Sequence, residues 1–293
     1  MPLSAPGLSS QELERILRLP AGECMAQVLN FLLDTSLTGA DVEFCLGKRQ
    51  IRATDLGQKV FRLECWHNPQ GHISSVASGL VRFLFKEEGE PAPGSWAYIA
   101  AQIAILFAAV GVLAREGIAG PGREADISAV AGDMSGVMSA WYARKWGLPI
   151  GTIICGCNEN NGFWELLHHG QLRTDGVAVR TLTPEADVVV PWGLERLIHS
   201  CGGQESVDSF LSCVRAGKTY VPESSLLAEL RRGLYVGVVS EPRVQRTAAG
   251  VYRNRGCVMS AYDAIAYAST QDYRAQGGSG KTCFILSTRR PGR

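Results

Sequence analysis

The chain has 293 residues, of which 46% are hydrophobic, and its 29 lysines and arginines nearly balance 28 aspartates and glutamates. This composition suits a globular protein with a sizeable core. No basic run is interleaved with aromatic residues, so the charge pattern of a nucleic-acid-binding protein is absent. Nine irregularly spaced cysteines, and no basic region before an apolar stretch at the N-terminus, lead us to expect a reduced, cytoplasmic protein without a secretory signal.

The N-terminal part of the chain carries the pattern of amphipathic helices. Residues 9–19 have Ser9 at a plausible N-cap and Glu12 three positions later, followed by apolar residues at helical spacing. The same spacing recurs over residues 23–33. We therefore predict a helical N-terminal subdomain that covers residues 1–58.

A short strand is predicted at residues 59–66, followed by a helix at 73–88 and a turn-rich segment at 88–95. The next segment, 97–114, contains a single clearly polar residue, Gln102, and just reaches the length that spans a membrane. It is rich in alanine and lacks flanking belts of aromatic and basic residues. We therefore expect a core helix that is buried on all sides.

A strand at 125–131, a helix at 137–147 and a strand at 150–156 form a βαβ unit. Such a unit predicts an α/β fold with a parallel sheet flanked by helices. We assign it to a domain that covers residues 59–293, with a helical insertion at about 200–235. Further helices are predicted at 161–172, 207–217, 224–233 and 261–270, and a closing strand at 282–288.

Cys155-Gly156-Cys157 has a spacing found among metal ligands. A single Cys-x-Cys without a second pair of ligands is weak support for zinc, and a small apolar pair that ends a buried strand explains it better. No metal site is predicted.

Residues 63–85, LECWHNPQGHISSVASGLVRFLF, resemble the segment of threonine synthases that leads into the helix with the pyridoxal phosphate (PLP) lysine. In this comparison the Schiff-base lysine corresponds to Ser74, and a serine cannot form an aldimine. Five residues match the family pattern without a gap: Leu63, Glu64, Trp66, His67 and Pro69.

The resemblance extends along more than half of the chain. ISAVAGDMSGVMSAWYARKWGLPI follows the family's V-P-x-G-N-F-G…G-L-P-I segment, and PWGLERL follows P-S-N-x-E-R-L. It implies a threonine synthase-like large domain of PLP fold type II. The small cofactor domain is missing, because only KEEGEPAPGS (86–95) stands in its place. The matching segments, in the family's order, are 94–109, 127–150, 157–172, 181–198, 259–267 and 286–291.

The departures from the family all concern the cofactor. The loop that cups the PLP phosphate is Gly132-Asp133-Met134-Ser135 instead of G-N-F-G, and a carboxylate there opposes a phosphate dianion. Tyr262 replaces a family histidine, whereas Thr288 is retained at the position that contacts the pyridine nitrogen. The resemblance therefore implies that no PLP is bound and that no other cofactor is needed. A PLP enzyme with its lysine elsewhere is the alternative; its candidates are Lys86, Lys145, Lys218 and Lys281.

A pocket shaped for an amino acid in an imine, but without a lysine, could join a free amine to an aldehyde. The chain also resembles small bacterial Pictet–Spenglerases, which are cofactor-free homodimers. We expect a Pictet–Spengler cyclase that condenses L-tryptophan, or a derivative, with an aldehyde to give a β-carboline in natural-product biosynthesis. The alternatives are an inactive threonine synthase-like scaffold, an amino-acid-binding protein and, less favoured, a PLP-dependent lyase.

The resemblance to these cyclases assigns the catalytic base to Glu87, in preference to Glu88 or Glu64, and a second catalytic role to Arg62. A working base at neutral pH needs a pKa raised by burial. Glu87 could instead belong to a solvated acidic turn, as we expect for Glu88 and Glu90. Arg62 could equally form a structural ion pair with Glu64.

Six residues are predicted to bind substrate: His67, His72, Ser74, Asp133, Thr288 and Arg290. The histidines suit proton shuttling, or they are simply packed. Asp133 could hold the substrate ammonium, and Arg290 could hold a carboxylate, unless it belongs to a frayed basic tail. Loss of the small domain exposes apolar surface, so we predict a homodimer with small-molecule substrates and no nucleic-acid or membrane partner.

Overall fold

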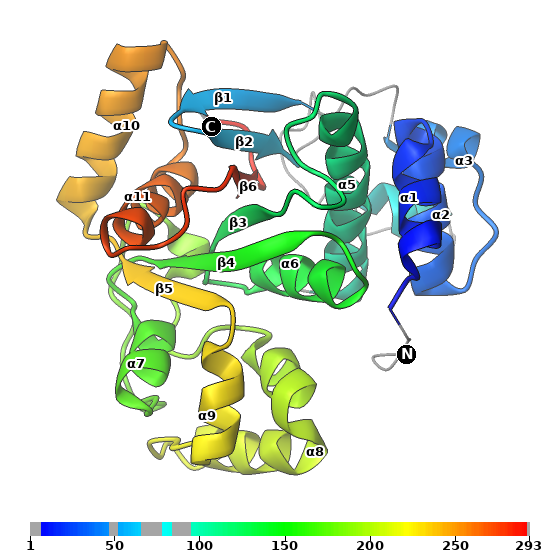
Figure 1. The fold of residues 1–293 in the computed structure, drawn as a ribbon. Coiled ribbons are helices and arrows are strands. Elements are labelled where there is room, and N and C mark those ends of the chain that lie inside the picture. The colour runs from blue at the N-terminus through cyan, green and yellow to red at the C-terminus, as the bar shows by residue number, and fades with distance from the viewer. Residues whose placement is uncertain (1–6, 47–51, 66–77, 84–94, 292–293) are drawn as a thin grey trace. The chain divides into compact units, whose positions relative to one another are not determined.

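The computed structural model describes residues 7–46, 52–65, 78–83 and 95–291. Six strands form a mixed sheet in the order β1-β2-β6-β3-β4-β5, flanked by helices (Figure 1). The strands are β1 (Ala53–Gly57), β2 (Val60–Glu64), β3 (Ala125–Val130), β4 (Ile150–Cys157), β5 (Leu234–Val238) and β6 (Cys283–Ser287). This sheet confirms the α/β fold class.

The helices of the described residues follow the predicted order, with additions. They are α1 (Ser10–Arg18), α2 (Ala21–Leu33), α3 (Gly39–Leu46), α5 (Trp96–Arg115), α6 (Ser135–Lys145), α7 (Gly162–His169), α8 (Leu194–Arg215), α9 (Ser224–Arg231), α10 (Glu241–Arg255) and α11 (Ala261–Ala275), with a short 3₁₀ turn at Pro184–Ala186. The sequence did not predict α3, α10, β1 or β5. The predicted helix at 73–88 is described only over residues 78–83, which are helical.

The pairing of the strands is mainly parallel. β2 with β6 and β4 with β5 are parallel pairs, whereas β1 pairs antiparallel with β2. The predicted helical N-terminal subdomain, residues 1–58, therefore also contains strand β1 near its end.

The chain divides into two compact units. The first contains Met1–Ile127, Ser139–Gly151 and Lys281–Arg293, and the second contains Ser128–Met138 and Thr152–Gly280. The domain boundary predicted at residue 58 lies inside the first unit, where β1 and β2 pair across it.

In the first unit, α1 begins with the predicted capping box. The Glu12 backbone N–H donates to Ser9 Oγ at 3.3 Å, and the Ser9 N–H donates to Glu12 Oε2 at 3.0 Å. Two of the free N–H groups of the helix start are thereby satisfied. Leu13, Ile16 and Leu17 form the buried face of this helix.

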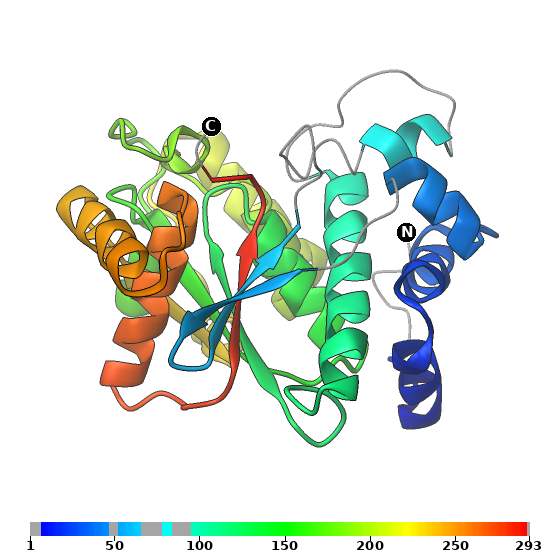
Figure 2. The same cartoon turned by 90° about the horizontal axis from the view of Figure 1, so that it is seen from above.

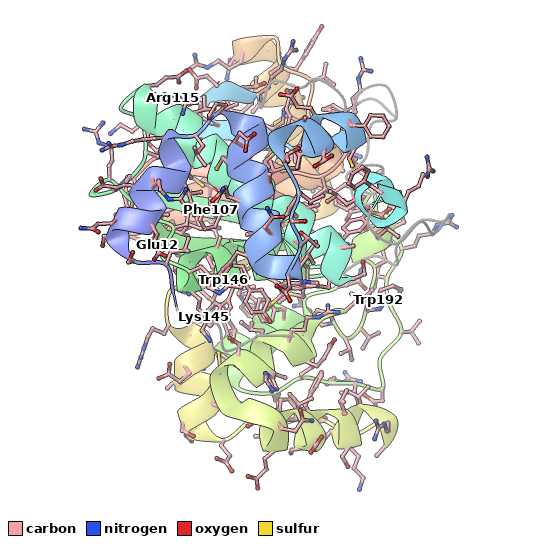
Figure 3. The ribbon with its side chains drawn as sticks, turned by 90° about the vertical axis from the view of Figure 1, so that its right-hand side faces the viewer. Glu12, Phe107, Arg115, Lys145, Trp146 and Trp192 are labelled. Atoms are coloured by element: carbon pink, nitrogen blue, oxygen red, sulfur yellow. The ribbon has the colours of Figure 1, made fainter. Side chains whose placement is uncertain are left out.

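The apolar helix α5 is the centre of the first unit. Both α1 and α2 pack against it, and Figure 2 shows it between these helices and strands β1, β2 and β6. Phe107, only 1% exposed, lies on α5 where α1 and α2 cover it (Figure 3). Among the described residues it is the one helix with the length and hydropathy to cross a membrane, and 83% of that window is buried inside the fold. The prediction of a buried core helix is confirmed.

The second unit is built on β4 and β5. Helices α7, α9 and α11 pack against β5. Its core includes Val239, Val244, Ala264, Ile265 and Ala268. The long helix α8 is broken at Gly203, whose φ of 73° is non-helical, so the predicted helix at 207–217 forms its second half.

All nine cysteines are free thiols. Cys155 and Cys157 end the buried strand β4, as the apolar interpretation of this pair requires. Burial raises the pKa of Cys157 to about 12, which keeps the thiol protonated, whereas zinc binds the thiolate.

Substitution of two helical glycines by alanine is expected to change the stability of the protein in opposite directions. A Cβ at Gly111 of α5 would lie 2.5 Å from the Leu17 carbonyl oxygen, whereas a Cβ at Gly250 of α10 would meet no atom within 4 Å. Gly111→Ala should lower the free energy of unfolding by about 1–2 kcal/mol, because the clash exceeds the gain in helix propensity. Gly250→Ala should raise it by about 0.5–1 kcal/mol. Urea unfolding of both variants measures this, and stabilisation by Gly111→Ala would contradict the close packing of α1 on α5.

Candidate functional site

The carboxyl ends of β2 and β6 lie side by side in the first unit. Glu64 pairs with Ser287 in the parallel register, and the Cys65 N–H donates to the Ser287 carbonyl at 2.9 Å. Thr288 therefore begins directly beside the end of β2. Ligands of α/β sheets bind at the carboxyl ends of the strands, so this edge is a candidate site.

Arg62 and Glu64 form an ion pair on β2. Arg62 Nη2 lies 3.2 Å from Glu64 Oε1, and their side chains are 9% and 11% exposed. The hydroxyl of Thr54 on β1 donates to the same oxygen at 2.9 Å. The ion pair with Glu64 that was the structural alternative for Arg62 is therefore formed. Because Glu64 is two residues further along β2, the guanidinium points toward the carboxyl end of the strand, and a contact with substrate stays a prediction.

The remaining predicted residues of this part of the chain are only partly described. Thr288 is half-buried, and Arg290 is exposed. The predicted base and three predicted substrate contacts lie outside the described residues: Glu87, His67, His72 and Ser74.

Asp133 belongs to the second unit, in the loop between β3 and α6. Its Oδ1 accepts hydrogen bonds from the Ser135 backbone N–H at 3.0 Å and from the Ser135 hydroxyl at 2.8 Å. Met134 between them adopts a left-handed φ of 56°. The Asp133 carboxylate therefore stabilises a tight turn. It also places a negative charge of the protein at the amino end of α6, where a bound anion would otherwise be attracted.

The same loop is packed tightly from its other side. A Cβ at Gly132 would lie 2.6 Å from the Ala186 Cα, so only glycine fits there. The Trp192 N–H donates to the Gly132 carbonyl at 3.2 Å. The cavity that Gly132 and Ala186 help to line has a volume of about 10 Å³, which is room for no more than one water molecule.

Trp192 is a residue that sequence reasoning missed. Its side chain is 58% exposed although its backbone is bonded to the Asp133 loop (Figure 3). The adjacent Gly193 has a φ of 84°, and a Cβ there would lie 3.5 Å from the Asp133 carbonyl oxygen. The sequence did contain the signal, because Trp192-Gly193 replaces Ser-Asn in the motif P-S-N-x-E-R-L.

Comparison with known proteins leads to threonine synthases. The chain is 26% identical to threonine synthase of Pseudomonas aeruginosa over 182 residues, which are 61% of this chain and 38% of that protein. It is 22% identical to human threonine synthase-like 1 over 176 residues, 59% of this chain and 24% of that protein. The chain thus matches less than half of the length of each of these relatives. No family model matches it.

Solved structures agree in fold. PLP-bound threonine synthase from Brucella melitensis has a TM-score of 0.82 at 16% identity, covering 98% of this chain and 81% of that one. The yeast enzyme has a TM-score of 0.82 at 15% identity, covering 99% and 81%. Relatives and structures together support a threonine synthase-like chain with the fold of PLP fold type II.

The loop that would cup a PLP phosphate does not fit that group. A phosphate dianion at the amino end of α6 would meet the Asp133 carboxylate, which already accepts the Ser135 N–H. Like charges at this distance repel, and the helix terminus can no longer offer that N–H to a ligand. Ser74, which the motif resemblance places at the lysine position, lies outside the described residues, so the loss of the lysine stays a prediction.

Removal of the Asp133 charge should restore part of the anion affinity. Asp133→Asn keeps an acceptor for the Ser135 N–H but removes the negative charge. We expect wild type to give no aldimine absorbance with PLP, and the variant to bind inorganic phosphate roughly tenfold more tightly than wild type in calorimetry, about 1.4 kcal/mol. Asp175→Asn, which alters an exposed carboxylate of the same unit, is the control. A protonated-aldimine band with wild type would contradict this assignment.

Proposed function

We propose that this threonine synthase-like chain is a cofactor-independent Pictet–Spengler cyclase that joins L-tryptophan, or a derivative, to an aldehyde. The observation that carries the proposal is the pairing of Trp192 with the Asp133 loop. An exposed indole ring, 58% accessible, stands on a segment bonded to a loop that carries a carboxylate. The Trp192 ring can stack on an aromatic side chain, and the Asp133 carboxylate can pair with an ammonium group, so the two suit a substrate that is an aromatic amine.

The proposed reaction needs no redox partner. The substrate amine adds to the aldehyde, water leaves, and the resulting imine gains a proton to become an iminium ion. Indole C2 then forms a bond to the iminium carbon, and the proton at C2 passes to a base, which restores aromaticity. The net change is an amine plus an aldehyde giving a tetrahydro-β-carboline plus water. In this proposal Glu87 is the base, and Asp133 pairs with the ammonium of the bound amino acid before it loses its proton.

Arg62 is proposed to act beside the substrate at the carboxyl end of β2. Its guanidinium is held by Glu64, which in turn accepts the Thr54 hydroxyl, so the cation has a fixed orientation. A fixed cation is suited to a carboxylate or carbonyl oxygen. Thr288 at the neighbouring strand end is proposed as a further polar contact.

A product assay with a base variant tests the reaction. Wild-type protein incubated with L-tryptophan and a panel of aldehydes should give tetrahydro-β-carboline, detected by mass. Glu87→Gln should lower kcat by about 10²- to 10⁴-fold, because the proton acceptor is lost. Glu90→Gln, in the expected solvated turn, is the matched control. Equal rates for Glu87→Gln and wild type would refute the base, and no product with any aldehyde would favour an inactive scaffold or an amino-acid-binding protein.

The aromatic platform has its own prediction. Trp192→Ala should raise KM for tryptophan by roughly three- to tenfold, with kcat little changed, because stacking of this kind contributes about 0.5–1.5 kcal/mol. Trp192→Phe should keep most of the affinity. Tyr252→Ala is a matched control, since Tyr252 is an equally exposed aromatic residue of the same unit, also 58% accessible. An unchanged KM for Trp192→Ala would remove this residue from the site.

A further inference from the structure

A second cavity lies within the second unit, between α7, β5 and α11. Its volume is about 510 Å³, within the range of small-molecule sites. Its lining includes Trp164 and His168 of α7, Tyr235, Val236 and Val238 of β5, and Asp272 of α11. None of these residues has a role in the reaction proposed above.

The backbone of β5 faces this cavity with an open edge. Among the described residues, β5 is the last strand of the sheet and pairs only with β4. The Ile153 N–H donates to the Gly233 carbonyl, and the Val239 N–H donates to the Cys157 carbonyl. Because the direction of backbone groups alternates along a strand, Val236 and Val238 turn their N–H and C=O groups away from β4.

These outward groups have no partner among the described residues. Val236 is nevertheless only 2% exposed. Val236 and Val238 both line the cavity, so a molecule that occupies it can take over, from water, the hydrogen bonds of these outward groups. On the side of β5 that faces β4, one β4 residue bonds both to the C=O of a β5 residue and to the N–H of the β5 residue two positions later. A ligand can bridge the Val236 C=O and the Val238 N–H in the same way.

The walls of the cavity favour a flat and uncharged ligand. The rings of Trp164 and His168 are stacked, with centroids 4.5 Å apart, and Tyr235 is a further aromatic residue of the lining. Asp272 is neutralised by Arg243 through two hydrogen bonds of 2.8 and 2.5 Å. The lining therefore carries no unpaired charge from Asp272 that would favour a charged ligand. Because α7 and α11 wall the cavity, the open edge is short, which favours a small molecule over an added peptide strand.

We propose that this cavity binds a neutral planar nitrogen heterocycle whose edge carries an amino donor next to a ring-nitrogen acceptor. The amino group donates to the Val236 carbonyl, and the ring nitrogen accepts the Val238 N–H. The ring contacts the aromatic surface of Trp164. The site lies outside the proposed reaction, so it is a second ligand site of the chain and is tested independently of the cyclase activity.

Adenine is a suitable probe because it has this edge, and unsubstituted purine is its matched control because it lacks the amino group. Calorimetric titration of the full chain should show one adenine site, with purine bound roughly three- to tenfold more weakly, as expected for one lost hydrogen bond. Val238→Pro removes only the outward N–H, since the β4 ladder uses the neighbouring residues. This variant should bind adenine at least tenfold more weakly with an unchanged Tm.

Val238→Ala retains the N–H and should bind adenine as wild type does. Trp164→Leu removes the aromatic surface and should weaken binding of both adenine and purine, which keeps the test valid if the proline variant does not fold. The proposal is overturned if adenine fails to bind at millimolar concentration, if purine binds as tightly as adenine, or if the folded Val238→Pro variant binds as wild type does. Binding of an extended peptide instead of adenine would also overturn it.

Discussion

The contact between the Asp133 carboxylate and Ser135 decides what the amino end of α6 can bind. A helix terminus offers unpaired N–H groups and a partial positive charge, and a free anion would normally satisfy both. Here the anion is part of the chain, 3.0 Å from the Ser135 N–H and 2.8 Å from its hydroxyl. A phosphate at that place would meet this carboxylate instead of a free helix terminus.

Neighbouring segments hold this loop in the conformation that the contact needs. Gly132 lies so close to the turn at Pro184–Ala186 that a side chain would clash, and the Trp192 N–H holds its carbonyl. The turn is itself fixed by Tyr262, whose hydroxyl accepts the Glu185 N–H at 3.2 Å. Tyr262, at the position where the threonine synthase pattern has a histidine, thus supports the turn that packs against the Asp133 loop.

Sequence patterns predicted the elements that carry a long or specific signal. The Ser9 and Glu12 spacing fixed the start of α1, and the apolar run of α5 is explained by its burial. The sequence did not predict β5 because its five residues, LYVGV, are too few to show a clear alternation of apolar and polar side chains. It did not predict α10 because only Val244 and Val251 form the buried face of that helix. In the site, Asp133 was visible as a mismatch in a motif. The exposure of Trp192 and the open edge of β5 depend on non-local pairing, which no local pattern contains.

The ion pair on β2 gives Arg62 a structural partner, and its role toward the substrate stays a prediction. Two charges that are about nine-tenths buried lose their hydration, and such a pair often stabilises a protein no more than apolar residues of the same size would. A gain in stability is therefore a weak explanation for the charged pair on β2, the strand between β1 and β6. The pair does fix the direction of the Arg62 guanidinium, because Glu64 holds it and Thr54 holds Glu64 in turn, and this fixed direction is what the proposed contact with an oxygen of the substrate would need.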